Sequence, residues 1–198
     1  NTITFESANG NNSSVEINAV SLGVTNVTGV TFKNLTFKSC QATIGLNGNK
    51  VTFKGNIFSG SSAAAGTFFS TIYSSKYHED LKITGNTFIQ SSSLHLFYNH
   101  VYGGAYPKRT IVNGNVFREP GRTAIDVGNV DSLVVDSNSF YRTNTITVSN
   151  CQAIRILQPR NYFKITRNYI NGTFETGIDI GIKNGNNIAG SSIENNVV

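Results

Sequence analysis

Short segments in which apolar and polar residues alternate recur along the whole chain, and each is followed by the same kind of turn. The repeat consists of an alternating strand, a small residue or turn former, an asparagine, one further residue and an apolar residue. Residues 81–88 (LKITGNTF) give a clear copy. Alternation with a period of two predicts β-strands with one buried face. No segment shows the apolar period of a helix, so the pattern indicates an all-β chain.

The copies of this repeat lie at unequal distances along the chain. The apolar residues that close them are Phe37, Phe58, Phe88, Phe117, Phe140, Ile170 and Val198, which are 21, 30, 29, 23, 30 and 28 residues apart. A constant motif at variable spacing predicts a fixed coil with loops of different length inserted in it. Leucine-rich repeats would keep a strict leucine frame, and propeller blades need about 40 residues each. We therefore expect a parallel β-solenoid of about seven coils.

The recurring Gly-Asn-x-Phe turn resembles that of the right-handed parallel β-helix family, the pectate-lyase-like superfamily, over nearly the whole chain. The resemblance implies a right-handed, single-stranded parallel β-helix in which the asparagines stack as a ladder inside a turn. The ladder positions would be Asn56, Asn86, Asn115, Asn138, Asn168 and Asn196. A buried amide can donate to and accept from its copies one coil away, which agrees with this arrangement. The fold hosts lyases, hydrolases, epimerases, tailspikes and inert stalks, so it leaves the function open.

A second column of short strands follows these turns, each with one residue between two apolar ones. We place its members at residues 15–17, 44–46, 69–71, 94–96, 125–127, 154–156 and 178–180. Side chains alternate between the faces of a strand, so the middle residue of each points outward. Coils in register would then stack His95, Asp126, Arg155 and Asp179 in one exposed row.

Composition limits the class of protein. The 198 residues include 13 Phe and 8 Tyr, enough apolar surface for a core, whereas only 14% are charged. We expect one domain over residues 1–198, and we exclude general disorder, a coiled coil and a membrane span. The formal net charge of +5 suits an acidic partner. Nucleic acid is not expected, because the basic residues are scattered and no nucleic-acid motif occurs.

Two carboxylates in the row raise the hypothesis of glycoside hydrolysis. Asp126 and Asp179 would lie two coils apart, roughly 10 Å. Inverting glycosidases hold their carboxyl groups about 6.5–9.5 Å apart so that a water fits beside the sugar. In this interpretation one Asp is the general acid, the other activates water, and Arg155 orients the substrate.

A lyase is the second chemical hypothesis. The resemblance implies that Arg155, Lys108 or Arg109 could remove the proton α to a uronate carboxylate, with Ca²⁺ held by acidic residues. Asp126 and Asp179 would have to bind that Ca²⁺, and Arg155 between them would oppose the cation; no other cofactor is expected. The Asp triplet and Gly-His-Gly of polygalacturonases do not occur. A surface ladder in which Arg155 relieves carboxylate repulsion explains the row equally well.

Two long loops, residues 72–80 and 97–110, are expected in successive coils beside the row. Aromatic rings stack on sugars, and Arg and Lys bind hydroxyls and carboxylates. The candidate substrate-binding residues are His95, Tyr73, Tyr77, Tyr98, His100, Tyr102, Tyr106, Lys108, Arg109 and Arg160. The alternative is that the tyrosines simply pack against the side of the solenoid.

The cysteines make a test of the coil layout. Cys40 and Cys151 would lie four coils apart, roughly 19 Å, which is too far for a disulfide. We predict two buried free thiols and no metal site.

The ends of the chain look unprotected. It begins at Asn1 without Met and stops at Val198 within a repeat, so we expect a piece of a longer protein. Flanking coils or a second copy would then cover the apolar ends.

The combined expectation is an extracellular, cell-surface or virion-surface β-helix protein that binds, and in one alternative cleaves, a polysaccharide in a groove along the helix. The competing hypothesis is a non-catalytic structural or adhesive stalk. A stalk should have short, interchangeable loops on every side, whereas this chain concentrates two long aromatic loops on one side, which favours binding.

Overall fold

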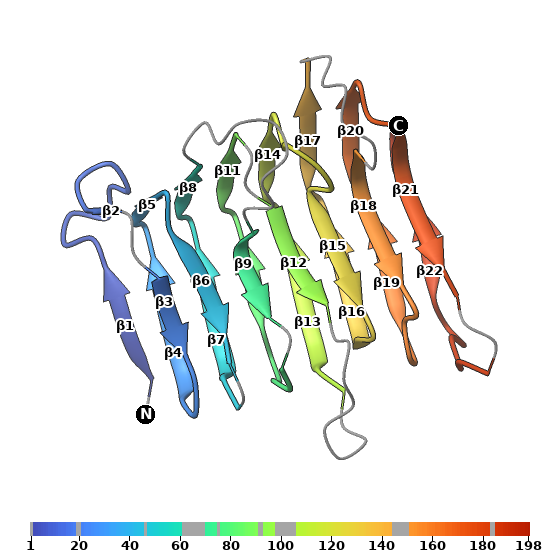
Figure 1. Cartoon of the computed structure of the whole chain (residues 1–198), viewed down its shortest axis with the longest axis horizontal. Coiled ribbons are helices and arrows are strands. Elements are labelled where there is room, and N and C mark those ends of the chain that lie inside the picture. The colour runs from blue at the N-terminus through green and yellow to red at the C-terminus, as the bar shows by residue number, and fades with distance from the viewer. Residues whose placement is uncertain are drawn as a thin grey trace.

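The computed structural model describes residues 2–18, 21–45, 47–60, 70–74, 76–90, 93–97, 106–143, 151–182 and 185–198, with the backbone alone for residues 70, 71, 93, 95 and 97. Every regular element in these residues is a β-strand. No described segment forms a helix able to cross a bilayer. Figure 1 shows the strands lying side by side in stacked layers along the long axis of the molecule.

Three parallel sheets build the fold, and the chain visits them in turn. The first sheet contains β1 (Ile3–Glu6), β4 (Thr28–Lys33), β7 (Asn49–Lys54), β10 (Lys82–Thr84), β13 (Lys108–Asn113), β16 (Asp131–Asp136), β19 (Phe163–Thr166) and β22 (Ser192–Glu194). The second contains β2 (Glu16–Asn18), β5 (Thr36–Lys38), β8 (Ile57–Ser59), β11 (Thr87–Ile89), β14 (Val116–Arg118), β17 (Ser139–Arg142) and β20 (Tyr169–Gly172). The third contains β3 (Ser21–Val24), β6 (Gln41–Ile44), β9 (Ser70–Ser74), β12 (Ser93–Phe97), β15 (Ile125–Gly128), β18 (Gln152–Leu157) and β21 (Thr176–Gly181).

This architecture confirms the all-β parallel β-helix. The chain makes about six turns, slightly fewer than the seven coils expected.

The asparagine ladder is confirmed, and it satisfies every polar group of its inner members. The Asn115 side-chain amide donates to Ile83 O (2.8 Å) and to Asn138 Oδ1 (2.9 Å). Asn115 Oδ1 accepts hydrogen bonds from the backbone N (2.9 Å) and the side-chain Nδ2 (3.0 Å) of Asn86. The same four-bond pattern recurs at Asn86, Asn138 and Asn168. Each step therefore ties one coil to the next in a fixed register.

The left-handed backbone of the ladder turn falls on the residue before each asparagine. Gly114 has a φ of 63°, and Ser137 and Arg167 take the same conformation with φ of 53° and 55°. Glycine adopts this region without the Cβ clash that other residues meet, which explains why it precedes several of the ladder asparagines.

A stack of phenylalanines lines the core beside the ladder. The rings of Phe37, Phe58, Phe88, Phe117 and Phe140 lie 4.7–5.0 Å apart with interplanar angles of 6–9°. Their spacing equals that of neighbouring strands, about 4.8 Å, so the aromatic column and the hydrogen-bond ladders fit the same coil repeat. The closing position of the sequence repeat is thus a core position, and Phe117 and Phe140 are fully buried.

Three members of the expected second strand column are wrong. Residues 15–17 fall in β2 of the second sheet, where Ile17 is paired with Phe37. In place of residues 44–46 the third sheet uses β6, and in place of residues 69–71 it uses β9. These strands were misplaced because their inward-facing residues are not all large and apolar. β6 buries a small Ala42, and β9 buries the polar Ser74, whose hydroxyl donates to Ile44 O (2.9 Å).

The cysteine prediction is confirmed, since Cys40 and Cys151 are both buried free thiols. Cys40 precedes β6 and Cys151 precedes β18, four strand steps away in the third sheet.

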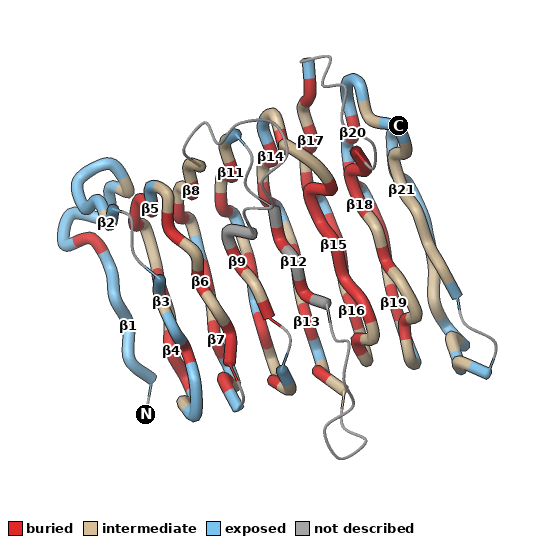
Figure 2. Tube along the Cα trace, in the orientation of Figure 1, coloured by how far each residue is buried: buried red, intermediate tan, exposed pale blue. Residues whose placement is uncertain are grey.

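Both ends of the described solenoid expose apolar side chains, and Figure 2 shows the exposed β1 beside better-buried inner strands. Ile3 and Phe5 are exposed at one end, and Ile193 and Val198 at the other. An apolar hollow of about 460 Å³ opens at the first coils, with Ile17 among its lining residues. Covering of the ends by flanking coils or by a second copy stays a prediction.

The ladder predicts a large loss of stability for Asn115→Ala. The change leaves two buried Asn86 donors without an acceptor, so we expect the free energy of unfolding to fall by about 3–5 kcal/mol. Urea unfolding followed by circular dichroism measures it. Asn113→Ala is the control, because Asn113 lies two residues earlier on the outer face and is only partly buried. Equal stability of the two variants would contradict a supporting role for the ladder.

Candidate functional site

One row of residues crosses the outer face of the third sheet. His95 is paired with Asp126, Asp126 with Arg155, and Arg155 with Asp179, as the sequence predicted. The structure adds Tyr73 to this row, because Tyr73 of β9 is paired with His95. The sequence analysis had placed Tyr73 in a loop, since the strand column was set three residues too early in that coil, at residues 69–71 in place of 72–74.

The expectation that the whole row is exposed is wrong for Asp126, which is only 5% exposed. Arg155 holds this carboxylate from the next strand by two hydrogen bonds. Its Nε donates to Oδ1 (2.8 Å) and its Nη2 donates to Oδ2 (2.5 Å). The guanidinium therefore covers both carboxylate oxygens of Asp126 on the side that was expected to face solvent. Arg155 itself is half-buried.

The electrostatics of this pair favour the charged guanidinium. The hydrogen bonds to Asp126 raise the pKa of Arg155, burial opposes that shift, and the negative charges of Asp126 and Asp179 add to it. An arginine in this state cannot serve as a base that removes a proton from a sugar. The geometry argues against Arg155 in the lyase hypothesis.

Asp179 has a different environment. It is half-buried, and its Oδ2 accepts a hydrogen bond from Gln152 Nε2 (3.0 Å). Gln152 Oε1 in turn accepts one from Thr123 Oγ1 (3.2 Å). Gln152 and Thr123 are buried residues that the sequence analysis did not single out, because neither belongs to the repeated motif.

The two carboxylates are therefore not equivalent. A general acid has to carry a proton, whereas two charge-assisted hydrogen bonds from a guanidinium require the carboxylate form. Asp126 does not suit that role, and Asp179 suits it better. The Arg155 guanidinium, bound to both Asp126 oxygens and paired in register with Asp179, places a positive charge between the two carboxylates that would oppose a Ca²⁺ ion. Across the described ranges, no group of three or more His, Cys, Asp or Glu residues is arranged to hold a metal ion.

The two segments expected as loops are partly strands. The first begins within β9, which continues to Ser74. The second begins at Phe97, the last residue of β12, and ends within β13, which starts at Lys108. The expectation of loops over the full residues 72–80 and 97–110 is therefore wrong at those ends. Tyr98, His100 and Tyr102 lie outside the described residues, as does the side chain of His95.

Tyr77, Glu79, Asp80 and Arg109 form a cluster at the turn that leads from the third sheet to the first. Arg109 Nη2 donates to Glu79 Oε2 (2.7 Å), and Arg109 Nε donates to Asp80 Oδ1 (2.5 Å). The Tyr77 hydroxyl donates to Glu79, which raises the pKa of Tyr77 to about 12. The hydrogen bonds that Arg109 donates to Asp80 and Glu79 raise the pKa of Arg109, which argues against Arg109 as a base.

Tyr106 and Arg160 form a second cluster at this turn. The Arg160 guanidinium carbon lies 4.2 Å from the centre of the Tyr106 ring. Its Nη1 donates to Asn186 Oδ1 (3.2 Å) and its Nη2 to Asn129 Oδ1 (3.0 Å). One face of Tyr106 is thus covered by Arg160, which leaves the other face as the candidate for stacking on a sugar. Lys108 begins β13 nearby and is bridged to Glu79 through the backbone.

His78, in the turn between β9 and β10, is fully buried. Its Nδ1 lies 3.3 Å from Ser74 Oγ, and its carbonyl oxygen accepts a hydrogen bond from Lys108 N (3.1 Å). Burial lowers the pKa of His78 from 6.5 to about 4, and a backbone hydrogen bond with Lys76 opposes this shift. The sequence analysis gave His78 no role, since burial of one histidine in a long loop has no sequence signal.

We predict that His78 stays neutral in the folded chain down to about pH 4. The unfolded chain takes up this proton near pH 6.5, so the free energy of unfolding should fall as the pH drops from 6.5 to about 4. Nuclear magnetic resonance of the imidazole carbons measures the titration directly. A His78 ring that titrates near pH 6.5 in the folded chain would contradict its burial.

Comparisons of the chain with protein-family models, with curated proteins and with solved structures find no match. The parallel β-helix therefore stands on strand register and ladder geometry, and no family is assigned to the chain.

Proposed function

We propose that this chain is a pectate-lyase-like β-helix that binds a polysaccharide along the outer face of the third sheet. The single observation that supports this most is the row of Tyr73, His95, Asp126, Arg155 and Asp179, one residue per coil in parallel register. A polymer laid along the helix axis would meet one of these positions at every coil, about 4.8 Å apart.

The chemistry of the row and its neighbouring turn suits a charged glycan. Tyr73 and Tyr106 supply half-buried aromatic surface, and Arg155 supplies a guanidinium that remains partly accessible. Aromatic rings stack on sugar faces, and guanidinium groups recognise carboxylates. The net charge of +5 favours an acidic polysaccharide. An extracellular, cell-surface or virion-surface location belongs to the same proposal, because such polymers occur there.

Cleavage requires more of the row's carboxylates than binding does. Only Asp179 keeps the freedom that acid–base catalysis requires, since Asp126 is committed to Arg155. A binding role needs no second free carboxylate. We therefore place binding first and treat hydrolysis as an activity to be measured on the same substrates.

The binding proposal predicts that Tyr73→Ser weakens retention on an acidic polysaccharide. Affinity electrophoresis in gels containing polygalacturonate, alginate, hyaluronan or dextran should show retention by the acidic polymers. We expect about a tenfold loss for Tyr73→Ser, as the removal of ~1.4 kcal/mol of stacking would cause. Tyr141→Ser is the matched control, because Tyr141 is a half-buried tyrosine on the second sheet. Equal behaviour of the two variants, or no retention by any polymer, would favour a structural stalk.

The same polymers test cleavage when products are followed by reducing-end and unsaturated-sugar assays. If the chain hydrolyses one of them, Asp179→Asn should lower the rate by about 10²–10⁴-fold. Asp126→Asn should mainly lower stability, because it removes the partner of Arg155. If Asp179→Asn cleaves the polymer as fast as the intact chain does, Asp179 takes no part in the mechanism.

A further inference from the structure

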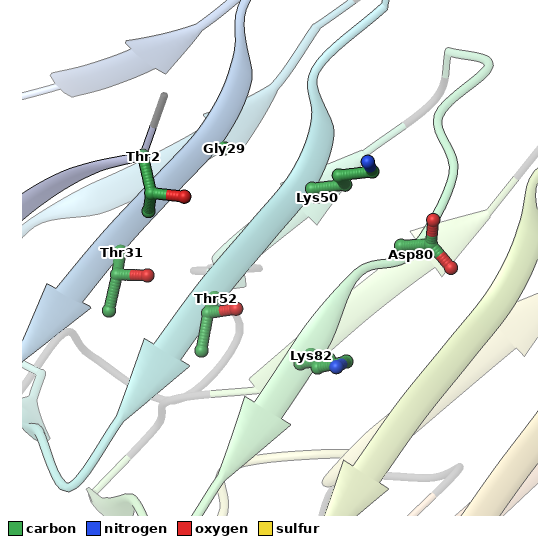
Figure 3. Close-up of a pocket in the computed structure, with 7 residues that line it drawn as sticks. All are labelled: Thr2, Gly29, Thr31, Lys50, Thr52, Asp80 and Lys82. Atoms are coloured by element: carbon green, nitrogen blue, oxygen red, sulfur yellow. The ribbon is translucent and has the colours of Figure 1, made fainter.

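A groove lies on the outer face of the first sheet, away from the row on the third sheet. It has a volume of about 400 Å³ and crosses β4, β7 and β10. Thr31, Thr52 and Lys82 form its base in register, one from each strand. Lys50 lies on β7 two residues before Thr52, Asp80 precedes β10 by two residues, and both close one side of the groove (Figure 3).

Among the described residues that line this groove, Asp80 supplies the one carboxylate, and Arg109 is bound to it. Asp80 Oδ1 accepts a hydrogen bond from Arg109 Nε (2.5 Å), and its Oδ2 accepts one from Arg109 Nη2 (3.0 Å). Those hydrogen bonds are the main reason that the pKa of Asp80 is lowered, and Lys50 and Lys82 contribute further through their charges. Asp80 therefore has both oxygens engaged by Arg109, which also binds Glu79. Three cationic groups, on Arg109, Lys50 and Lys82, thus face two carboxylates and leave one net positive charge.

Lys50 and Lys82 are exposed and form no ion pair within the described residues. The other salt bridges of the first sheet join residues of neighbouring coils, such as Lys33 with Glu6 (2.6 Å). Two ammonium groups beside a neutralised carboxylate give the groove a net positive charge. Such a site attracts an anion, more strongly at low ionic strength than at high.

The threonines complete the set of donors. Thr31 and Thr52 are half-buried, and neither hydroxyl takes part in a side-chain hydrogen bond within the described part of the chain. Figure 3 shows these hydroxyls and that of Thr2 turned the same way. Hydroxyls donate to an anionic oxygen and also accept from a sugar hydroxyl. A volume of about 400 Å³ exceeds what a bare ion fills and falls within the range of small-ligand sites.

We propose that this groove is a second binding site, for an acidic sugar whose carboxylate or sulfate group lies between Lys50 and Lys82 while Thr31 and Thr52 contact the ring hydroxyls. The inference does not rest on binding at the third sheet, because it uses other strands and other side chains.

The test is a titration of the ¹⁵N-labelled chain, at low salt, with glucuronate, with glucose as the uncharged match, and with sodium sulfate. We expect glucuronate to shift the amide signals of Thr31, Thr52 and Lys82, glucose to leave them unchanged, and sulfate to bind more weakly than glucuronate. Lys50→Gln and Lys82→Gln should each weaken glucuronate binding by about tenfold or more. The lysines are exposed, so neither change should affect folding.

Lys164→Gln is the matched control. Lys164 lies on β19 of the same sheet and is related to Lys82 by register through the intervening strands, but it does not line the groove. It should bind glucuronate as the unmodified chain does. The proposal is overturned if the groove amides do not respond to glucuronate, if Lys164→Gln weakens binding as much as Lys82→Gln, or if sulfate binds as tightly as glucuronate. If Lys82→Gln loses glucuronate binding at the groove while Tyr73→Ser keeps it, the groove and the row on the third sheet are separate sites.

Discussion

The lateral hydrogen bonds of the buried asparagine ladder are the constraint on which the remaining structure depends. Each inner ladder residue donates two hydrogen bonds and accepts two, so a coil that slipped by one residue would leave several buried groups without partners. Register set inside the turn is transmitted to the strands on both sides. The phenylalanine column and the surface rows are consequences of the same alignment, because all follow the strand spacing.

Because the register is fixed, residues that are far apart in the sequence become neighbours on the surface. Residues about 30 positions apart become lateral partners, and their charges then pair across coils. Glu6 with Lys33, Asp126 with Arg155 and Asp136 with Arg167 are all bridges of this kind. An exposed pair such as Glu6 with Lys33 contributes little stability by itself. The larger effect of these bridges is to neutralise most of the carboxylates, so that the lysines without partners decide where the surface stays positive.

The sequence was sufficient for the fold and for the row, but not for the environment of each side chain. The repeated asparagine and the apolar residues around His95, Asp126, Arg155 and Asp179 carry strong periodic signals, and the structure aligns them as predicted. Tyr73 was missed as a strand residue because a buried serine replaces an apolar residue beside it. The burial of Asp126 and the positive groove depend on which side chains pair, and pairing follows from rotamers and turn geometry that periodicity does not encode.

In-register parallel winding is the central claim, and one distance tests it most directly. Lys38 and Asn171 lie in one outer row of the second sheet, five strand steps apart. Nitroxide labels on Lys38→Cys and Asn171→Cys, in a chain with Cys40 and Cys151 replaced by alanine, report their separation by double electron–electron resonance. Parallel winding predicts a single narrow distribution near 24 Å, five spacings of about 4.8 Å. A broad distribution, or a separation far from this value, would contradict it.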